Sequence, residues 1–293
     1  MINILITGSN GQLGSEIKDI INHNISSIDN DMFFFTDRSL LDISNKKSVE
    51  DFVTKNSINV IVNCAAYTAV DKAEEDITSA QIINHKAVQY LAEISKDNDI
   101  KLIHISTDYV FDGKNYKPYK EEDCTNPQNV YGQTKLDSEK AMIEINPANS
   151  IIIRTSWVYS SFGNNFVKTM LKLGKQKEEL GVIFDQVGTP TYAKDLAKTI
   201  INIIPKLQNT QVELYHYTNE GVLSWYDFAK EIMKMAKLPC KINPIETYQY
   251  PTPALRPHYS VLNKSKIKNE FNISIPYWKD GLDECLRSLG ERR

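Results

Sequence analysis

The sequence has few cysteines and no long apolar run. Its cysteines, Cys64, Cys124, Cys240 and Cys285, lie far apart and form no Cys-x-x-Cys pair. That spacing argues against a zinc site or a disulfide framework and favours reduced thiols in a cytoplasmic protein. No apolar stretch reaches the roughly 18 residues that a membrane-spanning helix requires. The first six residues are apolar but lack the basic head of a signal peptide, so we interpret them as the start of a strand. We therefore expect no membrane partner.

The sequence also lacks a strong charge of either sign. Its formal net charge is −3, and its lysines and arginines are scattered rather than gathered into a stripe. Such a chain offers no basic field for nucleic acid, and we expect no nucleic-acid partner. No internal repeat or low-complexity linker interrupts it. At 293 residues it is long enough to bury roughly three quarters of its unfolded surface, in one large or two modest domains.

The first 160 residues contain an alternation of short apolar runs and longer amphipathic stretches. The runs predict strands at Asn3–Thr7, Met32–Thr36, Val60–Asn63, Lys101–Ser106 and Ser150–Arg154. The stretches between them predict helices near Gln12–Asn22, Lys47–Lys55, Ser79–Asp97 and Val130–Glu144. Alternation of this kind is typical of a parallel sheet covered by helices on both faces. The predicted fold class is α/β, with a Rossmann-type doubly wound parallel sheet in a nucleotide-binding domain over residues 1–160.

After Arg154 the pattern loosens. Helices are predicted near Asn165–Lys175, Ala193–Ile204 and Ser224–Ala236, the last with Ser224 as its N-cap. Two late strands, Gly181–Phe184 and Leu214–Tyr217, are expected to extend the central sheet. We therefore interpret residues 161–293 mainly as a smaller C-terminal substrate-binding lobe, interleaved with parts of 180–220 that return to the sheet.

A glycine-spaced turn follows the first predicted strand. The segment Thr7-Gly8-Ser9-Asn10-Gly11-Gln12-Leu13-Gly14 leads into a predicted helix. Glycines let the backbone approach a pyrophosphate, whose charge then lies at the positive N-terminus of the helix. A simple strand-to-helix turn would need one glycine, not three at spacing three. The turn therefore predicts a dinucleotide cofactor held at Gly8, Gly11 and Gly14.

The residues after the second predicted strand bear on the choice of cofactor. Asp37 would accept hydrogen bonds from the adenosine ribose hydroxyls and favour NADH, whereas Arg38 would pair with a 2′-phosphate and favour NADPH. Because the chain has both, NADPH and NADH both remain open. Asp42 and Ile43 are placed to flank the adenine.

A tyrosine and a lysine four residues apart supply a candidate acid. Tyr131 and Lys135 would share one face of a helix, about one turn apart. A free phenol has a pKa near ~10, and a nearby ammonium ion favours the phenolate and lowers that pKa. Thr107 follows an apolar run about two dozen residues upstream. Together with the glycine turn, these residues predict an oxidoreductase site in which the phenol gives its proton to a reacting oxygen. His104, inside the apolar run, is interpreted as a hydrogen-bonded core residue.

Several motifs together are typical of one enzyme superfamily. The glycine turn, Asn63–Glu74 (NCAAYTAVDKAE), Ser106–Phe111 (STDYVF) and Tyr131-x-x-x-Lys135 resemble the extended short-chain dehydrogenases/reductases. Later segments resemble, more narrowly, the dTDP-4-dehydrorhamnose reductase family. These segments are Arg154–Tyr159 (RTSWVY), Gly163–Phe166 (GNNF), Asp185–Thr191 (DQVGTPT) and Tyr250–Pro257 (YPTPALRP). The resemblance covers nearly the whole chain. It implies reduction of the 4-keto group of dTDP-4-dehydro-β-L-rhamnose (dTDP-6-deoxy-L-lyxo-4-hexulose) by NADPH or NADH, the last step of dTDP-rhamnose biosynthesis.

The resemblance also implies roles for individual residues. Tyr131 is the proton donor, Lys135 lowers its pKa and holds the nicotinamide ribose, and Thr107 hydrogen-bonds the keto oxygen. Asp108 and Trp157 contact the sugar, although a core aromatic is the alternative for Trp157. The positions that match cofactor contacts are Gly11, Gln12, Leu13, Ala66, Tyr67 and Thr68. For Arg256 we propose contact with the substrate pyrophosphate, because arginine pairs well with phosphate oxygens, with an ordinary surface arginine as the alternative.

Other functions stay open beside the reductase. A nucleotide-sugar dehydratase of this superfamily carries a glutamate after the aspartate, but here Asp108 is followed by Tyr109. A reductase or epimerase acting on another nucleotide-linked 4-keto-6-deoxy sugar is one alternative, and a non-catalytic regulatory subunit of the same fold is another. By resemblance only, Mg²⁺ and a homodimer are implied. Glu16 would then serve the subunit contact, or else be a solvated residue near the start of its helix.

Overall fold

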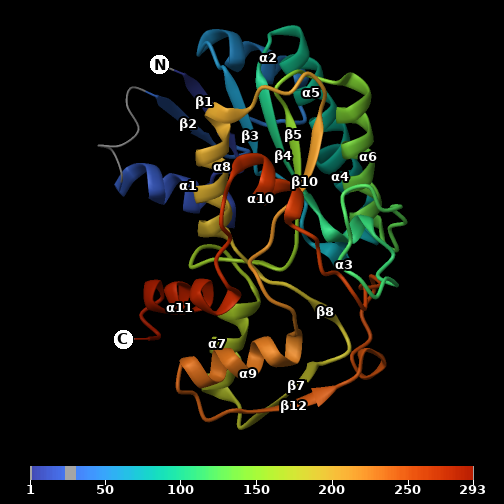
Figure 1. Ribbon diagram of the computed structural model, residues 1–293, viewed down its shortest axis with the longest axis vertical. Coiled ribbons are helices and arrows are strands. Elements are labelled where there is room, and N and C mark those ends of the chain that lie inside the picture. The colour runs from blue at the N-terminus through green and yellow to red at the C-terminus, as the bar shows by residue number, and fades with distance from the viewer. Residues whose placement is uncertain (1, 24–30, 293) are drawn as a thin grey trace.

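A six-stranded parallel sheet forms the larger part of the computed structural model, which describes residues 2–23 and 31–292 (Figure 1). The strand order is β2-β1-β3-β4-β5-β10. The strands are β1 (Asn3–Thr7), β2 (Met32–Thr36), β3 (Val60–Asn63), β4 (Lys101–Thr107), β5 (Ile151–Thr155) and β10 (Glu213–His216). The strands predicted before residue 160 are confirmed, each to within one residue. Since β2 and β3 lie on opposite sides of β1, the carboxyl ends of β1 and β3 form the switch point where open α/β sheets bind ligands.

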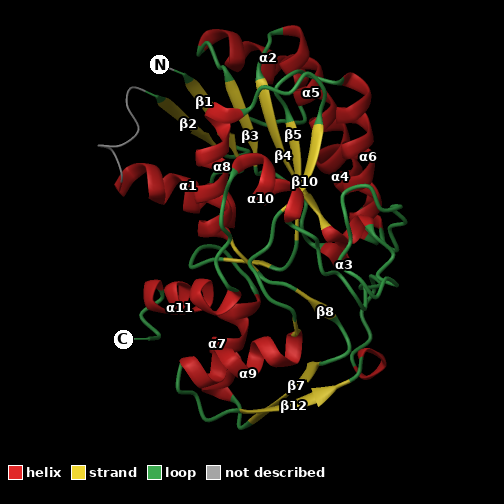
Figure 2. Ribbon diagram, viewed as in Figure 1, coloured by secondary structure: helices red, strands yellow, loops and turns green. Residues whose placement is uncertain are grey.

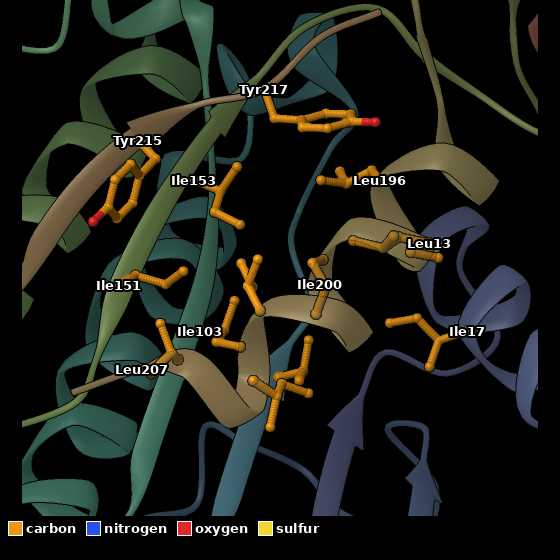
Figure 3. Close-up of a cluster of buried hydrophobic side chains, with 14 of the residues drawn as sticks. Leu13, Ile17, Ile103, Ile151, Ile153, Leu196, Ile200, Leu207, Tyr215 and Tyr217 are labelled. Atoms are coloured by element: carbon orange, nitrogen blue, oxygen red, sulfur yellow. The ribbon is translucent and has the colours of Figure 1, made fainter. Parts of the chain in front are cut away.

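Helices cover both faces of this sheet (Figure 2). One face is packed by α1 (Gln12–His23), α8 (Ala193–Ile203) and α10 (Ser265–Phe271). The other is packed by α2 (Lys46–Lys55), α5 (Ala87–Asp97) and α6 (Val130–Ile145). Figure 3 shows Leu196 and Ile200 of α8 lying against isoleucines of β4 and β5. Strands buried on both faces must be apolar throughout, which is why these runs could be recognised in the sequence.

The predicted helix Ser79–Asp97 is confirmed with one irregularity. The chain is α-helical at α4 (Ile77–Gln81), passes through the π-helical turn η1 (Ile82–Lys86) and continues as α5. A π turn inserts one extra residue into a helix and is frequent at functional sites. Here it directs Asn84, which is buried, toward the segment that follows β3. The single-turn helix α3 (Val70–Ala73) precedes it.

The carboxyl-terminal part of the chain builds a second, smaller lobe below the sheet in Figure 1. Its helices α7 (Phe166–Gln176), α9 (Trp225–Met235) and α11 (Trp278–Ser288) share an apolar core that includes Phe228 and Leu282. Paired short strands complete it: β6 (Val158–Tyr159) with β9 (Thr191–Tyr192), β8 (Val187–Gly188) with β11 (Leu223–Ser224), and β7 (Glu179–Ile183) with β12 (Lys241–Ile245). The short helical turns are η2 (Asp108–Val110), η3 (Ile204–Lys206) and η4 (Thr247–Gln249). Ser224 caps α9 as predicted, within a full capping box.

One predicted strand has a different partner from the one expected. Leu214–Tyr217 corresponds to β10, which pairs with β5 in the central sheet. Gly181–Phe184 corresponds to β7, and the expectation that it extends the central sheet is wrong, because β7 pairs with β12 in a separate two-stranded sheet. The strand follows α7, whose Val167 and Leu171 pack in the core of the lobe, so the chain emerges far from the sheet edge.

Within residues 2–23 and 31–292, no helix has the length and apolarity needed to cross a bilayer.

Candidate active site

The glycine turn packs the end of β1 against the end of β3. Gly8 has a φ of +64°, and a Cβ on it would lie 2.7 Å from the Cα of Ala65. A Cβ on Gly14 would lie 2.6 Å from the carbonyl oxygen of Gly8, whereas one on Gly11 would meet only that oxygen, at 3.2 Å. Only glycine permits the first two approaches. The first amides of α1, at Gln12 and Leu13, lie directly beyond this turn, and the first amides of a helix are available to a pyrophosphate.

The two residues that bear on cofactor choice are held differently. Asp37 lies directly after β2, and its carboxylate accepts hydrogen bonds from the Ser39 Oγ at 2.6 Å and the Asn10 Nδ2 at 2.6 Å. These bonds lower the pKa of Asp37. Arg38 has a side chain that is 80% exposed, and its Nε lies 3.7 Å from Asp42 Oδ2. The carboxylate is therefore fixed at the end of β2, while the guanidinium has room to move. Ile43 packs in the core behind them.

The segment Ala66–Thr68 is held at the same edge of the sheet by a residue that the sequence analysis missed. Asn84, in the π turn, accepts from the Tyr67 amide at 2.8 Å and donates to the Tyr67 carbonyl at 3.1 Å. It also donates to Thr134 Oγ1 on α6 at 3.1 Å. The sequence predicts only that Asn84 lies in a helix. The contact of its side chain with Tyr67 depends on the π turn, which the sequence pattern does not show.

Tyr131 stands in the first turn of α6, capped by Asn129, whose Oδ1 accepts from the Gly132 amide at 2.7 Å. Its ring meets that of Tyr109 edge to face, with centroids 5.7 Å apart. Burial raises the pKa of Tyr131 to about 12, and the nearby Thr107 hydroxyl only partly opposes this. The expected lowering of this pKa is therefore not found, because desolvation outweighs the stabilisation of the phenolate. A neutral phenol still suits a proton donor.

Lys135 lies one turn further along α6 and is fully buried. Its Nζ donates to the Ile105 carbonyl at 2.6 Å and lies 3.0 Å from His104 Nε2. Burial lowers the pKa of Lys135 to about 7, and Glu139 acts in the opposite direction. The interpretation of His104 as a hydrogen-bonded core residue is confirmed, since its Nδ1 lies 3.1 Å from Asn63 Nδ2 and its Nε2 lies 3.1 Å from the Ser138 hydroxyl. Its contact with the amine of Lys135 was not foreseen.

Thr107 and Asp108 stand at the carboxyl end of β4, beside Tyr131. Thr107 Oγ1 donates to Asp108 Oδ1 at 3.0 Å. Asp108 Oδ2 is buried and has no hydrogen-bond partner among the described residues. Burial raises the pKa of Asp108 to about 6, and the nearby hydroxyls of Ser260 and Thr107 partly offset this, although only the Thr107 contact has regular hydrogen-bond geometry. Ser260 comes from the far end of the chain, so no local motif could have placed it here.

Trp157 adjoins Gly188, as Ser260 does. Its φ of +48° is in the left-handed region, which is costly for an aromatic residue. Its ring stacks on Trp225 with centroids 3.6 Å apart and planes 13° apart. A Cβ on Gly188 would lie 2.9 Å from the indole and 2.6 Å from Ser260 Oγ. These residues form one wall of the site, and the half-buried indole lies outside the buried cores of the protein.

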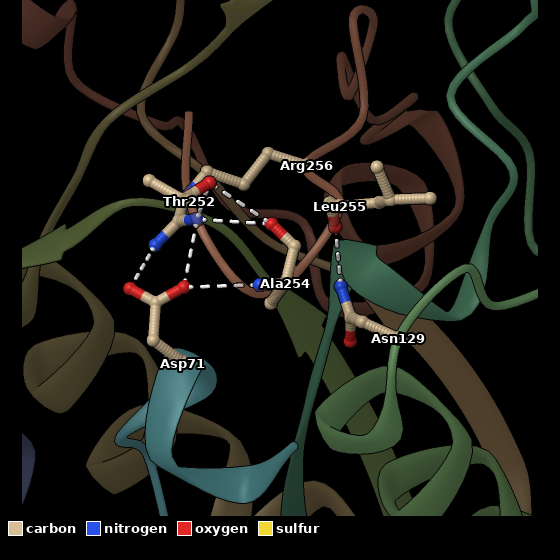
Figure 4. Close-up of polar contacts among 6 residues, drawn as sticks. All are labelled: Asp71, Asn129, Thr252, Ala254, Leu255 and Arg256. Carbon is tan, nitrogen blue, oxygen red and sulfur yellow. Dashed lines mark hydrogen bonds and ion pairs between the residues drawn. The ribbon is translucent and has the colours of Figure 1, made fainter. Parts of the chain in front are cut away.

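Arg256 already has partners for its guanidinium (Figure 4). Its Nη1 and Nη2 bind the two oxygens of Asp71 at 3.0 and 2.7 Å, and Nη1 also contacts Thr252 Oγ1. Only 23% of the side chain is exposed, so Arg256 is more buried than an ordinary surface arginine. Contact with a substrate pyrophosphate would require the Asp71 bonds to be shared or broken.

The interpretation of Glu16 as a solvated residue near the start of its helix is wrong. Glu16 is 1% exposed, and its Oε1 accepts from the Ser160 hydroxyl at 2.6 Å. Burial raises its pKa. Within residues 2–23 and 31–292 no three or more His, Cys, Asp or Glu side chains are grouped so as to hold a metal ion.

Comparison with known proteins agrees with this geometry. The family described as the RmlD substrate binding domain matches residues 2–290. The dTDP-4-dehydrorhamnose reductase of Aggregatibacter actinomycetemcomitans is 41% identical over 302 residues, which cover 99% of this chain and 100% of that one. A crystal structure of a dTDP-4-dehydrorhamnose reductase from Clostridium acetobutylicum superposes with a TM-score of 0.92 at 42% identity, covering 99% and 100% of the two chains. Another, from Bacillus anthracis in complex with NADP, superposes with a TM-score of 0.91 at 36% identity, covering 98% and 100%.

Proposed function

The chain belongs to the dTDP-4-dehydrorhamnose reductase family, and we propose that it reduces the 4-keto group of dTDP-4-dehydro-β-L-rhamnose to give dTDP-L-rhamnose. It is an oxidoreductase that uses a nicotinamide cofactor. The observation that carries the proposal is the meeting of Thr107, Tyr131 and Asp108 at the carboxyl ends of the strands, beside the glycine turn. The chain contains every side chain that this arrangement requires.

The roles of the side chains follow from their protonation and position. The bound cofactor supplies hydride to C4 of the sugar. Tyr131, whose pKa is raised further above neutrality by burial, holds a proton for the oxygen on which charge develops. The Thr107 hydroxyl lies beside that phenol and fixes the same oxygen. Lys135, one helical turn from Tyr131, has its pKa lowered to about 7 by burial, so its amine can both hold and release a proton near neutral pH.

The substrate would be held by the wall that contains Asp108 and Trp157. Asp108 Oδ2, buried and without a partner among the described residues, would accept a hydrogen bond from a sugar hydroxyl. The indole of Trp157 presents a flat apolar face of the kind on which a hexose packs, and Trp225 supports it from behind. Arg256 is left out of this set because its guanidinium is bonded to Asp71.

Cofactor preference is proposed to be dual. Asp37 is fixed by Ser39 and Asn10, so it would accept from the ribose of NADH without rearrangement. Arg38 is exposed and free to move toward a 2′-phosphate. Arg38→Ala should raise the KM for NADPH by roughly 10-fold or more, through loss of a charge-assisted pair, and leave that for NADH nearly unchanged. Equal changes in the two constants would show that Arg38 does not meet the cofactor.

A single assay separates the proposed reaction from its alternatives. Purified protein is mixed with NADPH and dTDP-6-deoxy-L-lyxo-4-hexulose, and the loss of NADPH absorbance is compared with the formation of dTDP-rhamnose. Stoichiometric conversion supports the reductase. An epimerase would change the sugar with no net oxidation of the cofactor and would carry retained NAD after purification, and a regulatory subunit would do neither.

The remaining parts of the proposal concern the cellular location, Mg²⁺ and the oligomeric state. The four cysteines are free thiols, which fits a reaction in the cytoplasm, where thiols are kept reduced. Mg²⁺ stays a prediction from family resemblance. A homodimer stays a prediction from family resemblance, which sedimentation of the purified protein would test.

A further inference from the structure

The single-turn helix α3 contacts two segments that are far apart in the sequence. Glu74, at its end, accepts from the Val130 amide at 2.8 Å and so binds the first residue of α6. Asp71, in its first turn, accepts from the Ala254 amide at 3.2 Å and pairs with Arg256 through both carboxylate oxygens (Figure 4). The same short helix thus holds both the start of the helix that carries Tyr131 and a loop from the C-terminal lobe.

That loop, residues 250–257, which we term the strap, is also bound directly to the N-cap of α6. Asn129 Nδ2 donates to the Leu255 carbonyl at 2.7 Å, while Asn129 Oδ1 accepts from the Gly132 amide at 2.7 Å. One amide side chain therefore caps the catalytic helix and anchors the strap. Tyr131 follows Asn129 by two residues, so a shift of the strap would be transmitted to the proton donor.

The other end of the strap leads into the sugar-facing wall. Pro257 occupies the space that a side chain on Gly113 would need, its Cβ lying 2.4 Å from where that Cβ would stand. The Tyr259 amide then donates to the Gly113 carbonyl at 3.1 Å. Ser260, the next residue, lies beside Asp108. One continuous segment therefore joins the helix of the proton donor to the wall that contains Asp108.

From these contacts we propose that Asp71, Asn129 and Arg256 form a clasp that sets the position of Tyr131 relative to the substrate lobe. All three are positioning residues. Arg256 acts through Asp71. In this proposal it does not bind the substrate pyrophosphate directly. The inference rests on the proposed reductase function, because its effect on catalysis is read through that reaction.

The decisive variant is Asp71→Asn, since the clasp and the pyrophosphate ligand predict opposite results for it. If Arg256 is held by Asp71, removal of the charge should lower kcat/KM for the sugar nucleotide by roughly 10-fold, the value of one charge-assisted hydrogen bond. If Arg256 binds the pyrophosphate, the same change frees the guanidinium and should leave kcat/KM unchanged or raise it. Asp51→Asn, which breaks the exposed pair with Lys47 on α2, is the matched control and should change nothing.

A double-mutant cycle sharpens the test. The clasp predicts that Asp71→Asn, Arg256→Gln and the double variant lose similar amounts of kcat/KM, because each breaks the same pair. Losses that multiply in the double variant would overturn the proposal. The dissociation constant for NADPH, measured on the same proteins, should stay near wild type.

Hydrogen exchange, followed by mass spectrometry, gives a result that does not depend on the identity of the substrate. Asp71→Asn should speed exchange of peptides covering both residues 250–257 and residues 129–135, whereas Asp51→Asn should leave both unchanged. Unchanged exchange in both peptides would overturn the clasp even if the protein is a reductase. Faster exchange in a protein that does not turn over the sugar nucleotide would overturn the proposed function and leave the clasp standing.

Discussion

Two buried polar clusters lie side by side at the carboxyl ends of β4 and β5, and they differ in how well their charges are paired. In the first, Arg154 binds Glu139 through Nε at 2.9 Å and Nη2 at 2.7 Å. Ser106 donates to the same carboxylate at 2.5 Å. In the second, one oxygen of Asp108 has no partner among the described residues, and Trp157 nearby has a left-handed backbone.

The cluster around Arg154 and Glu139 stabilises the fold, whereas the carboxylate of Asp108 is available to bind a ligand. The Arg154–Glu139 pair joins β5 to α6 with two parallel bonds, and the guanidinium also lies over the Phe111 ring at 4.9 Å. Such a pair stays in place because removing either partner would leave a buried charge. Arg154 Nη1 is also buried without a hydrogen-bond partner among the described residues, but the charge of Arg154 is paired with that of Glu139. The Asp108 cluster instead combines an unpartnered carboxylate oxygen with the backbone strain at Trp157, and such features persist in proteins mainly at functional sites.

The largest effect is expected from the phenol beside the second cluster. Tyr131→Phe removes one oxygen and no packing, so melting temperature and cofactor affinity should stay near wild type. The turnover number should fall by roughly 10²–10⁴-fold, the usual contribution of a positioned general acid. Single-turnover oxidation of NADPH by the keto sugar measures it. Tyr159→Phe, which removes a phenol oxygen in the core of the lobe, is the control and should remain active. A Tyr131→Phe enzyme within a few-fold of wild type would contradict the assigned mechanism.

Breaking the first cluster should affect stability. Glu139→Gln leaves the Arg154 charge buried without its counterion, and the free energy of unfolding should fall by roughly 3–5 kcal/mol. Urea denaturation at constant pH measures the change. Replacing both partners with apolar residues, Arg154→Met with Glu139→Leu, should recover most of this loss. If the single variant is as stable as wild type, the pair does not hold α6 on the sheet.

A substitution in the second cluster should raise the free energy of unfolding rather than lower it. The pKa of Asp108 is raised from 3.8 to about 6. Between these values the folded protein keeps a proton that the unfolded chain has lost, so stability falls as pH rises through this window. Asp108→Asn removes that dependence and should stabilise the protein by about 3 kcal/mol at pH 7.5, with little gain near pH 4. Denaturation curves at the two pH values decide it, and a loss of stability at pH 7.5 would show that the carboxylate is well paired. The KM for the sugar nucleotide should rise.

The smallest effect concerns the backbone of Trp157. At a φ of +48° glycine is favoured over alanine, so Trp157→Gly should be more stable than Trp157→Ala by roughly 1 kcal/mol. Thermal denaturation of the pair measures this. At Trp225, the first residue of α9, the order should reverse because alanine is the better helix former. The same order at both positions would mean that no strain is stored at Trp157.

Local patterns in the sequence were sufficient for the central sheet and for the glycine turn that follows β1. The strands of the first 160 residues could be located because a strand buried on both faces must be apolar along its whole length. β7 could not be assigned correctly, since its pairing with β12 joins segments about 60 residues apart and no local pattern encodes a partner. Trp225 and Ser260 were missed as neighbours of the site for the same reason.

The sequence by itself determined which chemical groups the site contains, because the spacing of Tyr131 and Lys135 and of the glycines is set by the period of one helix and the shape of one turn. Only the tertiary structure decided the pKa values of those groups. Burial, which depends on the packing of distant segments, raises the pKa of Tyr131 to about 12 and lowers that of Lys135 to about 7. It also decided the partner of Arg256, since Asp71 lies 185 residues away in the chain and the two meet only when the C-terminal lobe folds against α3.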